Sequence, residues 1–372
     1  MLKNNPMSQP HQIFPQSFKD SYSQNDVVDF VMTFENQSML ANSIRITGDL
    51  YINSTGTTAI TANSVDNSND VVFDSITGIH GAWQAITSVS DAGVLENNND
   101  YPRYVKAKAM SSLANTQFGT ESSRVCELRS GDTNSSITRA LATGNPNSRG
   151  ISFSMVPDIA LNKSSDHIPF NKTGPCKITL RLATNNQFLY GSNNNINYNY
   201  EIKNLQLHYR TIPQSSSKQL QFETVMAISN TIESNNVSLA TRVPATVQSV
   251  SCVFIREKNL NQIIPNHLAL EVPPAVERVE FSFNDSTTQY LTYELTDRED
   301  ILYNYQRSWG QGQKHNMTLE LLDHEGRAYG IGMPFGQLID MSNQKFGLNL
   351  KSNISNQDKY AIIMFFRGVV GL

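Results

Sequence analysis

Residue types that could perform metal chemistry are spread thinly along this chain. Among its seven histidines, only His315 and His324 lie near each other, and Asp323 and Glu325 flank the second of them. These four side chains could offer nitrogen and oxygen ligands to a metal ion. Histidines in the loops of a β protein are far more often exposed to solvent. We therefore interpret this segment as polar and predict no metal site.

Two acidic clusters also invite a chemical interpretation. The stretch "DNSND", residues 66–70, has oxygen ligands at calcium-like spacing, but it lacks the glycine and the later glutamate of an EF-hand loop. Residues 297–300, "DRED", could be mistaken for an acid/base pair. They lie where a helix is predicted to begin, so complementing the helix dipole is the better interpretation. Both clusters are predicted to be structural.

The motifs of the common enzyme classes are missing from the sequence. There is no HExxH, no GxSxG, no phosphate-binding GxxxxGK[ST] and no GxGxxG. A cupin-type enzyme would need clustered His and Glu ligands on strands, and the sequence has none. The sequence therefore predicts no catalytic residues, no cofactor-binding residues and no metal ligands. We expect a protein that is not an enzyme and uses no cofactor.

Cysteine usage and charge exclude further classes. Cys126, Cys176 and Cys252 are an odd number without CxxC spacing, so we predict buried free thiols and no disulfide framework. Only 17% of the 372 residues are charged and the net charge is -4. A surface for direct nucleic-acid binding is therefore not expected. The N-terminus has no apolar core of a secretory signal, so no secretory signal is predicted.

The elements that must carry any site are predicted to be strands. Ile178, Leu180 and Leu182 alternate with polar or small residues, which is the pattern of a half-buried strand. Helices are predicted at residues 101–113 and in "TDREDILYNYQRSWG", where Thr296 is the expected cap. Trp83 and Trp309 lie beside these helices, and we predict that they pack them onto the sheets.

The chain is predicted to contain two similar domains. We assign residues 1–26 to an extended N-terminal arm, 27–213 to a first domain, 214–218 to a linker and 219–372 to a second domain. In each half, a segment opening with Gly-Ile is followed by an alternating strand and then by a terminal strand: "GISFSMVPDIALN", "KITLRLATN" and "YEIKNLQLHYRTI" correspond to "GIGMPFGQLIDMSN", "KFGLNLKSN" and "YAIIMFFRGVV". This order of segments indicates two copies of one all-β domain.

The last 14 residues, "KYAIIMFFRGVVGL", raise a separate question because they are so hydrophobic. The run is too short for a membrane-spanning helix, which needs about 20 apolar residues. A strand in the middle of a sheet can be buried on both faces. We predict a final strand inserted between earlier ones. Together with long connections, this favours an all-β fold of two tandem eight-stranded jelly rolls with short helices in loops.

This architecture, and the segments "SFSMVPDIALN", "KITLRLATNNQFLYG", "YEIKNLQLHYRTIP" and "YAIIMFFRGVVGL", resemble the double jelly-roll major capsid proteins of the tectivirus and adenovirus lineage, which includes virophages and tailless phages. The resemblance covers residues 27–372. It implies a homotrimer of pseudo-hexagonal outline in an icosahedral virion shell assembled inside the host cell. It also implies neighbouring trimers, penton or minor capsid proteins, and in many members an internal viral membrane, as partners. The family has no catalytic residues to transfer.

Two alternatives stay open at this point. Within the viral class, the chain could be a minor capsid, penton or spike protein. Outside it, a carbohydrate-binding or adhesion protein with tandem β-sandwiches would share the Asn- and Ser-rich composition. Such a protein would normally carry a signal peptide and often exposed aromatic triplets or calcium loops.

Overall fold

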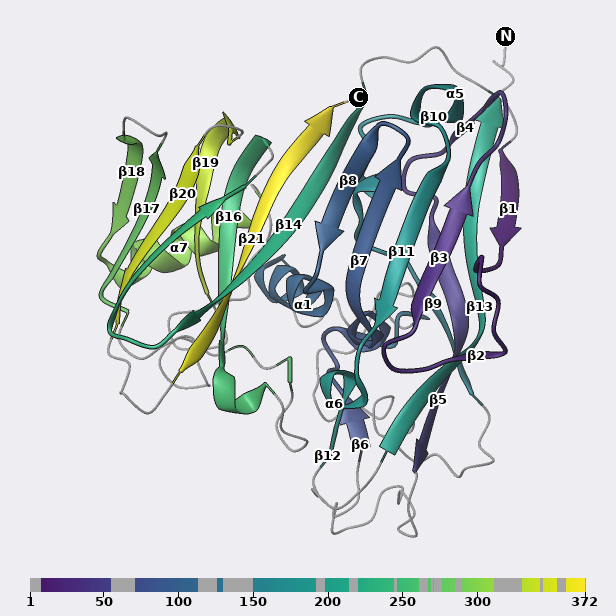
Figure 1. Cartoon of the computed structure of the whole chain (residues 1–372), viewed down its shortest axis with the longest axis horizontal. Coiled ribbons are helices and arrows are strands. Elements are labelled where there is room, and N and C mark those ends of the chain that lie inside the picture. Colours follow the sequence, from purple (N-terminus) through teal and green to yellow (C-terminus); the bar gives the residue numbers. More distant parts are fainter. Residues whose placement is uncertain are drawn as a thin grey trace. The chain divides into compact units, whose positions relative to one another are not determined.

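The computed structural model describes residues 8–54, 71–112, 126–129, 150–191, 198–213, 220–243, 246–260, 267–268, 270, 276–284, 289–310, 330–341, 344–352 and 359–371. The predicted linker, the "DNSND" stretch and the segment with His315 and His324 lie outside these ranges. Strands dominate the described chain (Figure 1). None of its described helices has the length and apolar character needed to span a membrane.

The chain forms two compact units. The first consists of Met1–Val105, Thr116–Thr224 and Val370–Leu372, and the second of Lys106–Asn115 and Val225–Val369. The division between them falls inside a long strand, a few residues after the predicted start of the second domain at residue 219. The predicted domain boundaries themselves stay a prediction.

The first unit contains two large antiparallel sheets, and a separate two-stranded sheet is formed by residues 71–73 and 189–191. One is built around β13 (Tyr198–Pro213), which pairs with β5 (Arg45–Ser54), and β5 pairs with β9 (Ile151–Met155). The second has the order β3-β11-β7-β8. Its strands are β3 (Val27–Met32), β11 (Cys176–Leu182), β7 (Trp83–Ser90) and β8 (Gly93–Asn98). As predicted, Ile178, Leu180 and Leu182 of β11 are buried, which places them on the core face of this sheet.

Shorter elements complete the first unit. They are β1 (Gln9–Ile13), β2 (Ser21–Tyr22), β4 (Gln37–Met39), β6 (Val71–Phe73), β10 (Ile168–Pro169), β12 (Leu189–Gly191), the short helices α5 (Phe170–Thr173) and α6 (Asn185–Phe188), and the 3-10 turns η1 (Gly78–Ala82) and η2 (Ala160–Lys163). β1 and β2 pair with β13, and the register of β1 runs from Gln9 opposite Thr211 to Ile13 opposite Leu207. The predicted N-terminal arm therefore contains strands of the first sheet from Gln9 onward, because its backbone groups pair with β13.

The second unit repeats the pattern with longer strands. One sheet has the order β19-β16-β21-β14 and the other the order β15-β20-β17-β18. The strands are β14 (Gln221–Ile232), β15 (Asn236–Arg242), β16 (Thr246–Arg256), β17 (Arg278–Asn284), β18 (Gln289–Leu295), β19 (Ile331–Asp340), β20 (Lys345–Lys351) and β21 (Tyr360–Gly371), and η3 (Glu257–Asn259) follows β16. Their inner faces share one core that includes Phe254, Phe281, Phe346 and Phe366.

The two units have the same strand order. If the main strands of each are numbered one to eight along the chain, with β1 and β2 together as the first strand of the first unit, one sheet reads one, eight, three, six and the other reads two, seven, four, five. This is the two-sheet jelly roll. The repeated segments of the sequence, β9 and β19, β11 and β20, and β13 and β21, hold the sixth, seventh and eighth places. The predicted fold class is confirmed.

Both predicted helices are present. The first is α1 (Tyr101–Ser112), and the second is α7 (Arg298–Ser308). α7 begins one residue later than a Thr296 cap requires, with Asp297 at the capping position and no side-chain hydrogen bond there. The final strand β21 pairs with β16 and lies between β16 and β14, as predicted from its uniform hydrophobicity.

Candidate functional site

The acidic segment at the start of α7 is structural. Glu299 and Asp300 lie in the first turn of the helix, where their negative charges complement the helix dipole. Among the residues that the structure describes, no group of three or more His, Cys, Asp or Glu side chains could hold a metal ion. The sequence-predicted candidates in 66–70 and 315–325 lie outside those residues.

Both tryptophans are fully buried. Trp309 follows the last residue of α7, and its ring lies 6.1 Å from the ring of Tyr305 in the helix and 6.1 Å from that of Phe365 in β21. It packs the helix onto the sheet, as predicted. Trp83 opens β7 and is completely inaccessible to solvent. Neither ring is available to stack on a sugar.

The cysteines are only partly as predicted. All three are free thiols, and Cys176 and Cys252 are buried. Burial raises the pKa of Cys176 to about 11, and burial likewise raises the pKa of Cys252, so neither is a reactive thiolate at neutral pH. The prediction of burial is wrong for Cys126, which is exposed. Cys126 lies in no strand, and its neighbour Glu127 takes the buried position in that segment.

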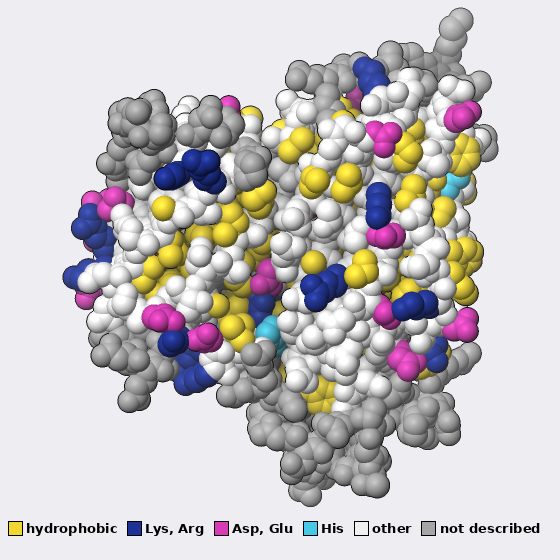
Figure 2. Space-filling view, viewed as in Figure 1, with side chains coloured by type: hydrophobic (Ala, Val, Ile, Leu, Met, Phe, Trp, Pro, Cys, Tyr) yellow, Lys and Arg dark blue, Asp and Glu magenta, His cyan; other side chains and the backbone are white. Residues whose placement is uncertain are grey.

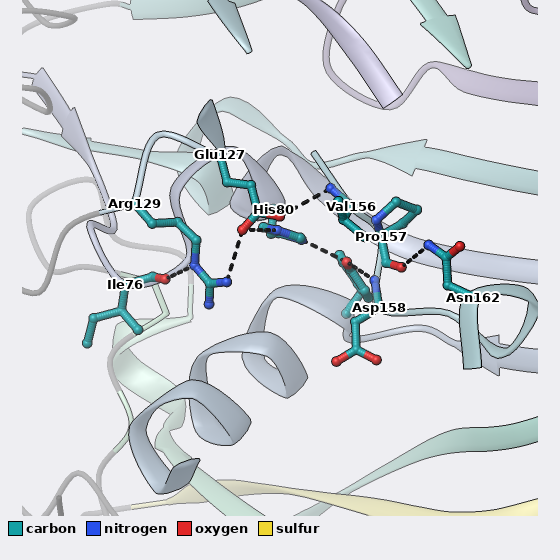
Figure 3. Close-up of polar contacts among 9 residues, drawn as sticks. Ile76, His80, Glu127, Arg129, Val156, Pro157, Asp158 and Asn162 are labelled. Carbon is teal, nitrogen blue, oxygen red and sulfur yellow. Dashed lines mark hydrogen bonds and ion pairs between the residues drawn. The ribbon is translucent and has the colours of Figure 1, made fainter. Parts of the chain in front are cut away.

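A group of buried polar side chains lies in the first unit (Figure 3). We call it the His80 cluster, and it consists of His80, Tyr101, Glu127 and Arg129. Each of these residues is less than one tenth exposed. They come from the η1 turn, from the start of α1 and from the segment 126–129. Because these polar side chains are buried together, the cluster is the strongest candidate site in the described chain.

The hydrogen bonds of the cluster fix the proton position on His80. The Nδ1 atom of His80 lies 2.7 Å from the hydroxyl of Tyr101, and that hydroxyl accepts a hydrogen bond of 3.1 Å from the backbone N–H of Asp158. Nε2 of His80 lies 3.4 Å from the Glu127 carboxylate, which can only accept, so the proton of the neutral ring resides on Nε2 and the Tyr101 hydroxyl donates to Nδ1. Burial lowers the pKa of His80, which keeps the ring neutral at physiological pH.

Glu127 is the charged centre of the cluster. Its Oε2 atom lies 3.3 Å from Nη1 of Arg129, and its Oε1 atom accepts a hydrogen bond of 3.1 Å from the backbone N–H of Val156. Burial opposes the charged form, but His80, Arg129 and the Val156 N–H outweigh it and lower the pKa of Glu127 to about 2. The Nε atom of Arg129 donates to the carbonyl of Ile76 at 2.7 Å.

These contacts tie separate chain segments together. The His80 cluster links the η1 turn, the start of α1, residues 127–129 and residues 156–158, as the dashed lines of Figure 3 show. Gly78 allows the close approach: its φ is +55°, and a Cβ atom there would lie 2.4 Å from the Glu127 carbonyl oxygen. The contacts of the cluster run between its own side chains and to nearby backbone groups, and this arrangement supports a structural tie between the segments.

Sequence reasoning did not find the His80 cluster. Its members are far apart along the chain and follow no periodic pattern, so no local rule connects them. The available signal was "TGIHG", in which two glycines flank a histidine in an otherwise strand-forming region. Glycines beside a polar residue indicate a close backbone approach, but they do not name the partner.

Charged side chains are scattered over one face of the molecule. On the face drawn in Figure 2, Lys and Arg side chains lie beside Asp and Glu in small groups over the described residues. Ion pairs on this kind of surface include Lys177 with Asp29 at 3.1 Å and Lys351 with Glu277 at 2.6 Å. Exposed pairs contribute about 0–1 kcal/mol each to stability, so they serve solubility more than folding.

Comparisons with known proteins show the fold. No family model matches the chain, and no curated protein matches it by sequence. The fold is similar to that of a chain in the Sputnik virophage structure, with a TM-score of 0.60, 9% identity and coverage of 100% of this chain and 87% of the other. The faustovirus major capsid protein gives a TM-score of 0.55 at 8% identity, covering 100% of this chain and 91% of that protein.

A third similar structure is the mavirus major capsid protein, with a TM-score of 0.53, 10% identity and coverage of 96% of this chain and 86% of that one. The similarity thus extends over nearly the whole length of both partners in each comparison. The likeness includes both units and not one of them alone. The chain therefore has the double jelly-roll fold found in viral major capsid proteins.

Proposed function

We propose that this protein is the major capsid protein of a virus, which forms pseudo-hexagonal homotrimers that tile an icosahedral virion shell. The observation that supports this most is the pairing of two jelly rolls of identical strand order in one chain, over a length that matches the mavirus and faustovirus major capsid proteins. Its role is structural and not enzymatic. It is located in the virion shell, and its partners are neighbouring trimers and penton or minor capsid proteins.

The composition of the protein suits that role. A shell subunit must stay soluble before assembly and then bury wide neutral contacts. Few charges and many Asn, Ser and Thr side chains allow hydrogen bonds across such contacts, including bonds through water. Large apolar side chains also remain accessible in the single chain: Phe14 is 54% exposed and Phe18 is 64% exposed. Contacts between subunits would cover surfaces of this kind.

Native mass measurement of the purified full-length protein tests the proposal. We expect a stable species of three times the chain mass, and icosahedral particles by electron microscopy when the protein is assembled. A trimer that never forms shells but caps the vertices or projects from a particle would instead support the minor capsid, penton or spike alternative. A monomer that binds glycans would support the adhesion alternative and contradict the capsid proposal.

A further inference from the structure

Exposed apolar side chains gather in two places on the chain. Among the residues that the structure describes, the exposed large hydrophobic side chains of the second unit are Tyr303 and Leu338, at 53% and 52%. Most of those in the first unit lie close together in the sequence, within residues 14–34: Phe14, Phe18, Val27 and Phe34. Large apolar side chains that gather on a surface mark contacts with other molecules.

The group in the first unit, which we call the arm patch, consists of Phe14, Phe18 and Val27. The ring centres of Phe14 and Phe18 lie 6.0 Å apart, with the rings at 83° to each other. An ion pair of 2.7 Å between Lys19 and Asp26 holds Phe18 near Val27, because each member of the pair adjoins one of these residues in the sequence. The arm patch therefore presents two aromatic rings on an ordered part of the surface.

The group in the second unit, which we call the α7 patch, consists of Tyr303, Leu338 and two neighbouring pockets of about 300 Å³ and about 530 Å³. Leu338 lines the smaller pocket, and Arg307 lines both of them. The hydroxyl of Tyr303 accepts a hydrogen bond of 3.1 Å from Nη1 of Arg307. The larger pocket has Glu294 and Asn304 in its lining and several apolar residues: Tyr293, Leu295, Met333, Pro334 and Phe335. Pockets of about 300–1,000 Å³ hold molecules of drug size, so an aromatic side chain of a partner fits in these volumes.

A bulge in β19 brings Leu338 to the surface. The pairing of β19 with β16 shifts register between Pro334 and Ile339, and residues 335–338 form the bulge. Phe335 stays in the core at 6% exposure, whereas Leu338 is 52% exposed. Bulges redirect side chains toward functional sites. An exposed leucine adds little to the core of its own unit, so its position favours a contact with another molecule.

The symmetry of a trimer indicates how the two patches are used. When three copies close a ring, each contact joins two different surfaces of the chain. A subunit of a closed trimer therefore needs two separate patches that fit each other. The arm patch offers protruding aromatic rings in the first unit, and the α7 patch offers pockets in the second. Both patches are exposed in the single chain, so neither is covered from within it.

We propose that the arm patch of one copy packs into the α7 patch of the next copy in the homotrimer. Phe14 and Phe18 of one copy fill the pockets beside Tyr303 and Leu338 of the other. This inference rests on the proposed capsid function, and it names the surfaces that hold the trimer together. The apolar centre of the contact is surrounded by polar residues, which is the usual anatomy of a protein interface.

Subunit exchange tests this contact in the full-length protein. Unlabelled and isotope-labelled trimers are mixed, and native mass measurement follows the mixed trimers over time. Phe18→Glu and Leu338→Glu each place a charge in the apolar contact at a position that is exposed in the single chain. Val94→Glu is the matched control, because Val94 is 61% exposed and lies outside both patches. We expect exchange about tenfold faster or more, or single chains, in both patch variants, and wild-type exchange in the control.

A pair of cysteines tests whether the two patches meet directly. Cys126, an exposed free thiol, is first replaced by serine. Chains that carry both Phe18→Cys and Leu338→Cys should then give covalent trimers with a flexible bis-maleimide. Chains that carry only one of these cysteines should give no cross-linked product, because the contact joins unlike surfaces. If a glutamate variant loses its native circular dichroism, Phe18→Ser or Leu338→Ser takes its place in the exchange experiment.

The outcomes separate this inference from the capsid proposal. Wild-type exchange rates in both patch variants overturn the inference and leave the trimer standing. The same holds if Val94→Glu accelerates exchange equally, if the paired cysteines give no covalent trimer, or if either single-cysteine variant gives cross-linked dimers. A wild-type protein that stays a single chain overturns both the inference and the proposed homotrimer.

Discussion

The last strands of the two units, β13 and β21, occupy the same place in their sheets but differ in composition. β13 alternates buried residues such as Leu207 with half-buried polar residues such as Gln206. In β21, residues 362–368 are buried without interruption. The difference follows from what covers the outer face. In the second unit, Trp309 at the end of α7 packs on Phe365, and the Ser308 carbonyl accepts a hydrogen bond from Arg367.

This comparison explains the hydrophobic end of the chain. A position in the middle of a sheet demands only that the inner face be apolar, as β13 shows with its polar outer residues. The outer face becomes apolar where a helix packs against it, as α7 does on β21. The unbroken apolar run of β21 is therefore explained by α7, which forms a third layer over the sheet.

The largest expected effect concerns the outer face of β21. Phe365→Ala should lower the free energy of unfolding by about 3–5 kcal/mol, because it leaves a cavity beneath Trp309. The equivalent change on the outer face of β13, Gln206→Ala, should alter it by less than about 0.5 kcal/mol. Denaturant unfolding of both variants measures the difference.

Matched inner-face variants control that measurement. Leu207→Ala in β13 and Phe366→Ala in β21 both remove buried side chains, so both should be costly, by about 2–5 kcal/mol. If Gln206→Ala destabilises the protein as much as Phe365→Ala does, the outer face of β13 is covered as well, and the explanation of the closing strand fails.

The second prediction concerns the stability of the first unit in acid. The folded pKa of Glu127, about 2, lies below its ordinary value of 4.5. Its stabilising contribution is therefore present above about pH 4.5 and is lost as the pH falls toward 2. The lowered pKa of His80 acts in the same direction below its ordinary value of 6.5. The first unit should lose stability as acid is added.

The two tryptophans make this measurable, because each unit contains one of them and both are buried. In Trp309→Phe, fluorescence reports the first unit through Trp83, and in Trp83→Phe it reports the second through Trp309. Urea midpoints between pH 7 and pH 3 should fall in the first variant. Adding Glu127→Gln should flatten that pH dependence while lowering stability at pH 7. If the urea midpoint depends on pH as strongly with Glu127→Gln as without it, Glu127 is not the cause of the acid sensitivity.

The third prediction compares two arginines on the last strands. Arg367→Met should cost about 1.5–3 kcal/mol, since it removes a charge-assisted hydrogen bond to the Ser308 carbonyl. Arg210→Met on β13 should cost less than about 0.5 kcal/mol, because Arg210 is exposed. Thermal unfolding of the two variants compares them directly, and equal shifts would show that the buried contact of Arg367 contributes nothing.

Local patterns predicted the strands and both long helices because each depends on neighbours in sequence. The alternation in β11, the uniform run in β21 and the charged first turn of α7 are all local signals. The order of the repeated segments also indicated the topology, since β9, β11 and β13 hold the same places in the first unit as β19, β20 and β21 hold in the second. Residues whose role depends on distant partners were not found. His80 meets Glu127, and Arg367 meets the Ser308 carbonyl, only after the sheets have formed.

The smallest expected effect concerns the first strand of each unit. In the second unit this strand is β14, with 12 residues, whereas in the first unit it is divided into β1, with five, and β2, with two. Between β1 and β2, Phe14 and Phe18 are more than half exposed. Chymotrypsin does not cleave the Phe14–Pro15 bond, but it can cut after Phe18. If subunit contacts cover this segment, that cut should be slower in assembled particles than in dissociated subunits. The β14 segment, continuous and largely buried at Phe222 and Val225, should resist cleavage equally in both states. Equal cleavage rates after Phe18 in particles and in free protein would mean that assembly leaves this segment uncovered, and the shell contacts must then lie elsewhere.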